Sequence, residues 1–153
     1  MKLADHSSNR WCFQLNHQEA NLLRGLLSKF PLSPVAGHPF SKSDDSAGAA
    51  DRQKLLNESL AEHRRDLKRL ARDLLREEHW RPSPQGPLLL LSSEAREILL
   101  QILNDIRLGC WQALGEPDDL EQLAPAEPLT SHRTLMDLAG YFEMNLLDPD
   151  VLC

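Results

Sequence analysis

The sequence predicts a mainly all-α fold of about four packed helices, with a minor ribbon of two short strands. Leu dominates the apolar residues and aromatic residues make up only 5%, a composition that favours helix over sheet. Four segments repeat apolar residues at helical spacing, and only two short stretches resemble strands. The chain of 153 residues has the usual length of one domain, so we expect a single helical domain over residues 1–153.

The first predicted strand is RWCFQL, residues 10–15, in which apolar residues alternate with others. A helix over about residues 17–30 follows. It begins with a capping box, in which the side chains of Asn16 and Glu19 accept each other's backbone N–H groups. Leucines at helical spacing give this helix one apolar face, and FPLSP ends it.

A second long helix is predicted from Asp51, its expected N-cap, to about Glu78. Small and polar residues before it, at about 35–50, predict a mobile loop. The helix carries apolar residues at alternating spacings of four and three, which is typical of a coiled-coil seam. We therefore expect this seam to contact a neighbouring helix, a protein partner or a second copy of the chain. The seam consists of Leu56, Leu60, His63, Leu67, Leu70 and Leu74.

The second half of the chain repeats the order of strand, polar cap and helix. LLLL, residues 88–91, is the second predicted strand, and Ser92 is the expected N-cap of a helix that ends at Gly115. An acidic, proline-containing linker at about 116–128 precedes a last helix that is capped by Thr130 or Ser131 and ends at DPD.

The third predicted helix contains LNDIRL, residues 103–108. Apolar residues cover more than half of its circumference, which predicts a central helix packed against two or three others. Asn104 and Asp105 project from the polar arc, whereas Arg107 projects from the apolar side. Because residues two apart do not face each other on a helix, Asp105 and Arg107 cannot pair.

Three interpretations of Arg107 follow. Its stem can lie along Trp111, one turn away, with the guanidinium in water. It can form a salt bridge with a carboxylate on another helix, such as Asp137, Glu19 or Asp66. It can also bind an anionic ligand or the carboxylate of a partner, which would make Asn104, Asp105, Arg107 and Trp111 a binding site.

Four arginines form a narrow stripe opposite the leucine seam of the second helix. Such a stripe could contact an acidic partner or a phosphate backbone. Acidic residues flank it, however, and the segment is nearly neutral, which favours a solvated face with local ion pairs. The stripe consists of Arg65, Arg69, Arg72 and Arg76.

Several function classes are disfavoured by charge and motifs. The net charge of -6 repels nucleic acid and anionic membranes, and no apolar run is long enough to cross a bilayer. Without a signal peptide the expected location is cytoplasmic. Three widely spaced cysteines and six scattered histidines match no metal motif, and no phosphate-binding loop or nucleophile motif occurs. The sequence therefore indicates no metal, cofactor or catalytic residue.

The segment LSSEAREILLQILNDIRLGCWQALG resembles an uncharacterised bacterial family of unknown function, known mostly from actinobacteria. Its members carry a Leu-Asn-Asp-Leu-Arg-Leu string in a late helix, after a Leu-(Ser/Thr)-Pro-Glu-Glu cap. Here Ser93 stands where Pro is usual, and Ile106 replaces a Leu. The genes of that family often lie near the gene for the ClpS adaptor of the Clp protease. The resemblance therefore implies a regulatory or adaptor role, and it maps onto Asn104, Asp105 and Arg107.

We therefore expect a non-enzymatic interaction or regulatory protein, which the resemblance links to regulated proteolysis. A protein that binds a small anionic ligand, or a small enzyme, with Arg107 as the anchor is the alternative. A DNA-binding regulator is a third and weaker alternative, because the charge is negative and no helix-turn-helix is evident.

Overall fold

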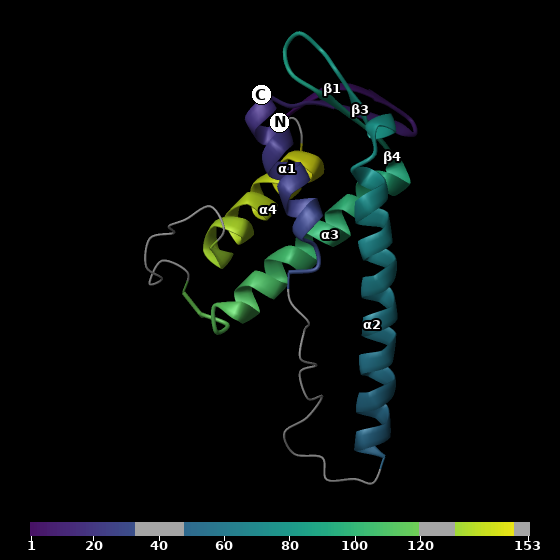
Figure 1. The fold of residues 1–153 in the computed structure, drawn as a ribbon, viewed down its shortest axis with the longest axis vertical. Coiled ribbons are helices and arrows are strands. Elements are labelled where there is room, and N and C mark those ends of the chain that lie inside the picture. Colours follow the sequence, from purple (N-terminus) through teal and green to yellow (C-terminus); the bar gives the residue numbers. More distant parts are fainter. Residues whose placement is uncertain (33–47, 120–130, 149–153) are drawn as a thin grey trace.

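The computed structural model describes residues 1–32, 48–119 and 131–148 of the chain. Within these residues it combines four α-helices with a four-stranded antiparallel sheet, and Figure 1 shows the sheet at one end of the molecule above crossing helices. In chain order the elements are β1 (Lys2–Ser7), β2 (Arg10–Gln14), α1 (His17–Lys29), α2 (Ala49–Leu74), the short 3-10 helix η1 (Glu77–His79), β3 (Trp80–Arg81), β4 (Leu88–Ser92), α3 (Ser93–Ala113) and α4 (His132–Leu147).

The predicted all-α class is wrong, because the protein has a mixed α/β fold. The two predicted strands do pair, with Phe13 of β2 opposite Leu89 of β4. This ribbon is the centre of a sheet of order β1-β2-β4-β3, not an isolated element. β1 carries little sequence signal because it is an edge strand in which only Leu3 is half-buried, and β3 has two residues.

The residues that cap or end the helices were predicted well. The Asn16 side chain accepts from the Glu19 backbone N–H, and the Glu19 carboxylate accepts from that of Asn16, each at 2.8 Å. The Ser92 hydroxyl caps α3 at 3.0 Å, and Ser131, not Thr130, caps α4. Gly115 follows α3 with a φ of 87°, the left-handed conformation that glycine adopts without steric cost.

The boundaries of α2 differ from the prediction. The helix begins at Ala49, so Asp51 lies in the first turn and is not the N-cap. It ends at Leu74 instead of continuing to about Glu78, and the Trp80 Nε1 donates to the Leu74 carbonyl at 2.9 Å. Residues 35–47 of the predicted mobile loop and residues 120–128 of the predicted linker lie outside the described residues.

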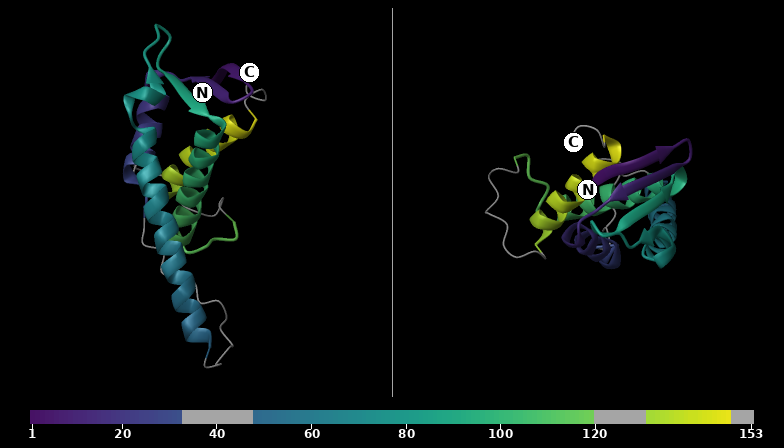
Figure 2. Two further views of the ribbon diagram at one scale, coloured as in Figure 1. Left: turned by 90° about the vertical axis from the view of Figure 1, so that its right-hand side faces the viewer. Right: turned by 90° about the horizontal axis from the view of Figure 1, so that it is seen from above.

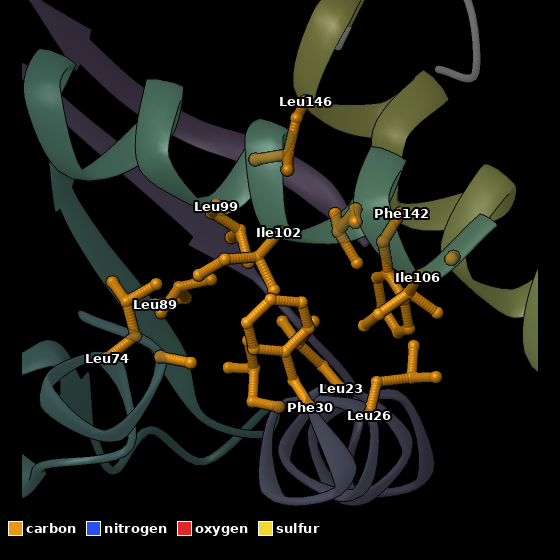
Figure 3. Packing of buried hydrophobic residues seen from close by; sticks show 14 of the residues in the cluster. Leu23, Leu26, Phe30, Leu74, Leu89, Leu99, Ile102, Ile106, Phe142 and Leu146 are labelled. Atoms are coloured by element: carbon orange, nitrogen blue, oxygen red, sulfur yellow. The ribbon is translucent and has the colours of Figure 1, made fainter. Parts of the chain in front are cut away.

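α3 lies between α2 and α4 and also contacts the sheet, so its predicted central position is confirmed. Figure 3 shows Ile102 and Ile106 of α3 meeting Phe142 of α4 and Leu23 of α1. All four side chains are at most 1% exposed. This core joins the sheet, α1, α3 and α4 to the C-terminal part of α2, where Leu67 and Leu74 are buried.

The N-terminal half of α2 extends beyond the other described elements. Figure 2 shows it projecting away from the sheet and the crossing helices. Between Ala49 and Asp66 no residue of α2 is fully buried. In a helix of 26 residues, only the C-terminal part is therefore stabilised by the core described above.

Candidate functional site

Arg107 pairs with a carboxylate on a neighbouring helix, Glu143 of α4. The Arg107 Nη1 donates to the Glu143 Oε2 at 2.5 Å. The arginine side chain is 48% exposed and the glutamate side chain 9%. The Arg107 stem lies over Gly140, where an added Cβ would be 3.6 Å from the Arg107 Nε. Of the three interpretations of Arg107, the geometry matches the interhelical salt bridge.

The three carboxylates named for that bridge have other partners. Glu19 accepts a hydrogen bond from the Tyr141 hydroxyl. The Asp66 Oδ1 is 3.9 Å from the Arg69 Nη2. The Asp137 Oδ2 is 3.3 Å from the Arg133 Nε. The salt bridge was one of three interpretations left open by the sequence, and none of the carboxylates named for it is the partner that Arg107 has. Glu143 carried no distinguishing signal, because which α4 side chain meets Arg107 depends on how α3 and α4 cross.

Trp111 lies one turn after Arg107 and makes a different contact. Its Nε1 donates to the Pro117 carbonyl at 3.2 Å, and its ring packs against the core. In the described part of the chain, the cation–π contacts join Arg24 to Trp80 and Arg96 to Trp11. The structure thus brings Trp111 to the loop after α3 and does not place it against the Arg107 guanidinium.

Asp105 lies on the other side of α3. It is half-buried, and its Oδ1 is 3.9 Å from the Arg64 Nη2 of α2. As the helical angles predicted, it does not pair with Arg107, but it is not simply directed to solvent. Asp105 and Arg107 attach α3 to α2 and to α4 respectively, while Asn104 is exposed. This arrangement explains the two charges of LNDIRL as contacts within the fold.

Three arginines of the predicted stripe lie on α2 and are exposed, namely Arg65, Arg69 and Arg72. Arg76 is also exposed, but it lies beyond the end of α2 at Leu74, because the helix is shorter than predicted. Arg76 forms an ion pair with Asp73 at 3.1 Å, and Arg69 one with Asp66 at 3.9 Å. Exposed pairs of this kind contribute little stability because water screens them. Arg65 and Arg72 also lie on this face, whose mixed charge fits the predicted solvated surface.

The leucine seam of α2 divides into two parts. Leu67 and Leu74 are buried in the core and Leu70 is half-buried. Towards the N-terminus, by contrast, Leu60 is 42% exposed, His63 is exposed and Leu56 is only half-buried. The Arg64–Asp105 pair marks the transition between the two parts. We call Ala49–His63 the exposed half of α2.

A hydrogen-bonded cluster that the sequence did not reveal joins α1 to α4. The Glu19 Oε1 accepts from the Tyr141 hydroxyl at 2.5 Å and from the Met1 amino group. Burial alone would raise the pKa of Glu19, but the hydrogen bonds from the amino group, Tyr141 and the Asn16 backbone outweigh it and lower this pKa. Burial, with the Glu19 carboxylate, raises the pKa of Tyr141 to about 12.

Metal and thiol chemistry find little support in the described residues. Within them, no three histidine, cysteine or acidic side chains lie close enough together to hold a metal ion. Cys110 is buried, which raises the pKa of its thiol to about 11, and Cys12 is half-buried in β2. In the same residues, no helix combines the length and apolar character needed to cross a bilayer.

Comparisons with protein-family models, with curated proteins and with solved structures gave no match. The resemblance carried by LNDIRL therefore stays a prediction. The candidate site that follows from the geometry is the exposed half of α2, because the charged residues of LNDIRL have partners within the fold.

Proposed function

We propose that this protein is a non-enzymatic interaction protein and that the exposed half of α2 is its contact surface. The single observation that carries the proposal is the divided seam. Its spacing continues without interruption from Leu56 to Leu74, yet only the C-terminal part is buried by the protein's own core. Leu60 is exposed, although it belongs to a row of apolar residues whose spacing is typical of a helix packed against another helix.

Helix stability supports the same conclusion. An isolated helix of about 15 residues is marginal in water, and most helical stability in proteins comes from packing an apolar face. The exposed half of α2 has this length, and none of its residues is fully buried. A partner that covers Leu56 and Leu60 would supply the missing packing. The link to regulated proteolysis rests on the resemblance alone, and it makes components of that process the first partners to look for.

The alternatives lack a comparable observation. An anion site at Arg107 would have to compete with Glu143, which already accepts from the guanidinium. A nucleic-acid contact through the arginine stripe would meet the carboxylates of Asp66 and Asp73 as well.

Affinity purification of the tagged protein from its native cell tests the proposal, with Leu60→Glu compared with Leu55→Glu. Both substitutions introduce the same charge into the exposed half, but Leu55 lies about 100° around the axis from Leu56 and outside the seam. We expect one defined protein, or a second copy of this chain, to be retained by Leu55→Glu and lost from Leu60→Glu. Recovery of the wild-type chain alone as a monomer, or equal retention by both variants, would contradict the proposal.

A further inference from the structure

We infer that the partner of the exposed half of α2 is a second copy of this chain, paired antiparallel about a two-fold axis near Glu58. The inference rests on the proposed function, because it identifies the occupant of the same surface. Three observations carry it: where the body of the protein lies along α2, which register matches leucine to leucine, and which charges then meet.

The position of the body favours antiparallel pairing. Leu67, Ala71 and Leu74 are buried in the core, so the sheet and the other helices surround the C-terminal end of α2. Figure 1 shows this end held by the body and the N-terminal end projecting away from it. Parallel helices would bring two bodies to the same end, side by side. Antiparallel helices place them at opposite ends of a shared two-helix segment.

The seam then selects one register. With the axis near Glu58, Leu56 lies opposite the partner's Leu60, and the two-fold axis repeats this contact. Moving the partner by one heptad towards the body would place Leu56 opposite the partner's Leu67. That leucine cannot form the contact, because the core of its own chain already buries it. Moving it by one heptad the other way would replace the leucine contacts with contacts to Ala49 and Gln53. The register centred on Glu58 is therefore the one that buries the exposed leucines.

Charge complementarity appears in this same register. Arg52 and Asp66 flank the seam on the same side, and in an antiparallel pair residues flanking one side face each other. Arg52 therefore faces the partner's Asp66, and Asp66 faces the partner's Arg52. Asp66 is 64% exposed, and its ion pair with Arg69 of the same helix is long, at 3.9 Å, and also exposed, so its carboxylate remains accessible for this contact. The pairing is self-complementary, as a two-fold interface must be.

His63 faces the partner's Gln53 at each end of the leucine layers. Polar residues at seam positions specify register at some cost in stability, which gives His63 a role in pairing. The shared segment from Arg52 to Asp66 is about 22 Å long. With only two leucine layers it buries less than a standard interface of about 1,600 Å². We therefore expect a reversible dimer whose population rises with protein concentration.

Sedimentation velocity of the purified full chain over a range of concentrations tests the pairing. Arg52→Asp or Asp66→Arg alone brings like charges together, and each should weaken the dimer about threefold to tenfold. The double variant Arg52→Asp/Asp66→Arg should restore it. Lys54→Asp, an equal charge change on the opposite side of the helix, is the matched control and should have no such effect.

Cysteine pairs distinguish the two directions. In a Cys12→Ser/Cys153→Ser background, protein with Leu56→Cys is mixed with protein with Leu60→Cys under mild oxidation. Antiparallel pairing yields the mixed disulfide, whereas parallel pairing would yield each variant linked to itself and overturn the inference.

A wild-type chain that stays monomeric at every concentration would also overturn it. That result leaves the proposed function standing if purification from the cell recovers a different protein whose binding depends on Leu60. If the chain neither forms a dimer nor recovers a protein whose binding depends on Leu60, the proposal and the inference are both rejected. Unchanged circular dichroism spectra of the variants show that any loss of pairing is not a loss of folding.

Discussion

Arg107 of α3 and Glu143 of α4 form an interhelical ion pair of 2.5 Å in which the carboxylate is nearly buried and the guanidinium is half exposed. A buried carboxylate without a partner is costly, so the arginine compensates for the burial of Glu143. The contact lies where α4 presents Gly140, which leaves room for the arginine stem. This pair makes the most distinctive motif of the sequence a structural link between helices.

Replacing Arg107 with Met is expected to lower the free energy of unfolding by about 1–2 kcal/mol. This is less than the roughly 3–5 kcal/mol of a fully buried pair, because the guanidinium is half exposed. Chemical denaturation measures the change, and a double-mutant cycle with Glu143→Gln measures the coupling. Arg76→Met, which affects the exposed pair with Asp73, is the control and should cost less than about 1 kcal/mol. Simple additivity of Arg107→Met and Glu143→Gln would show that the pair contributes nothing.

Two glycine substitutions should have opposite effects on thermal stability. Gly140→Ala adds a Cβ at ordinary contact distance from Arg107 within a helix, so it should stabilise the fold by about 0.5–1 kcal/mol. Gly86 has a φ of 114°, and an added Cβ would lie 2.2 Å from the Leu15 carbonyl oxygen. Gly86→Ala should therefore destabilise by at least about 1 kcal/mol. A lower melting temperature for Gly140→Ala would contradict the close but unstrained packing of Arg107 on α4.

The single tyrosine allows its ionisation to be followed directly by ultraviolet absorbance. We expect the pKa of Tyr141 to be about 12 in the folded protein, because burial and the Glu19 carboxylate disfavour the phenolate. Because the folded pKa is raised, this group's contribution to stability is complete below the unfolded value of about 10 and is lost as pH rises towards 12. Glu19→Gln should move the absorbance midpoint downwards. A midpoint near 10 in the folded wild-type protein would show that the Tyr141–Glu19 contact does not form.

Glu19 should contribute an acid-sensitive part of stability. Its folded pKa is lowered by the groups that donate to its carboxylate, so its contribution is present above the unfolded value of about 4.3 and is lost as pH falls through the folded pKa. The stability difference between wild type and Glu19→Gln, measured by urea denaturation from pH 7 downwards, should therefore shrink in acid. A difference that stays constant down to pH 2 would mean that the carboxylate charge has no role.

The sequence by itself determined the features that depend on neighbouring residues. The capping box at Asn16, the cap at Ser92 and the end of α3 at Gly115 were predicted because their hydrogen bonds and dihedral angles are local. The separation of Asp105 from Arg107 was predicted for the same reason, since helix geometry alone decides it.

Only the tertiary structure decided which distant groups meet. β1 is an edge strand with too few buried residues to produce an alternating pattern, so the sheet was underestimated. Glu143 became the partner of Arg107 through the crossing of α3 and α4, which no local spacing encodes. The seam of α2 is uniform in sequence, yet the fold buries Leu67 and leaves Leu60 exposed. Periodicity specifies which face of a helix can pack, but long-range packing decides how much of that face is covered.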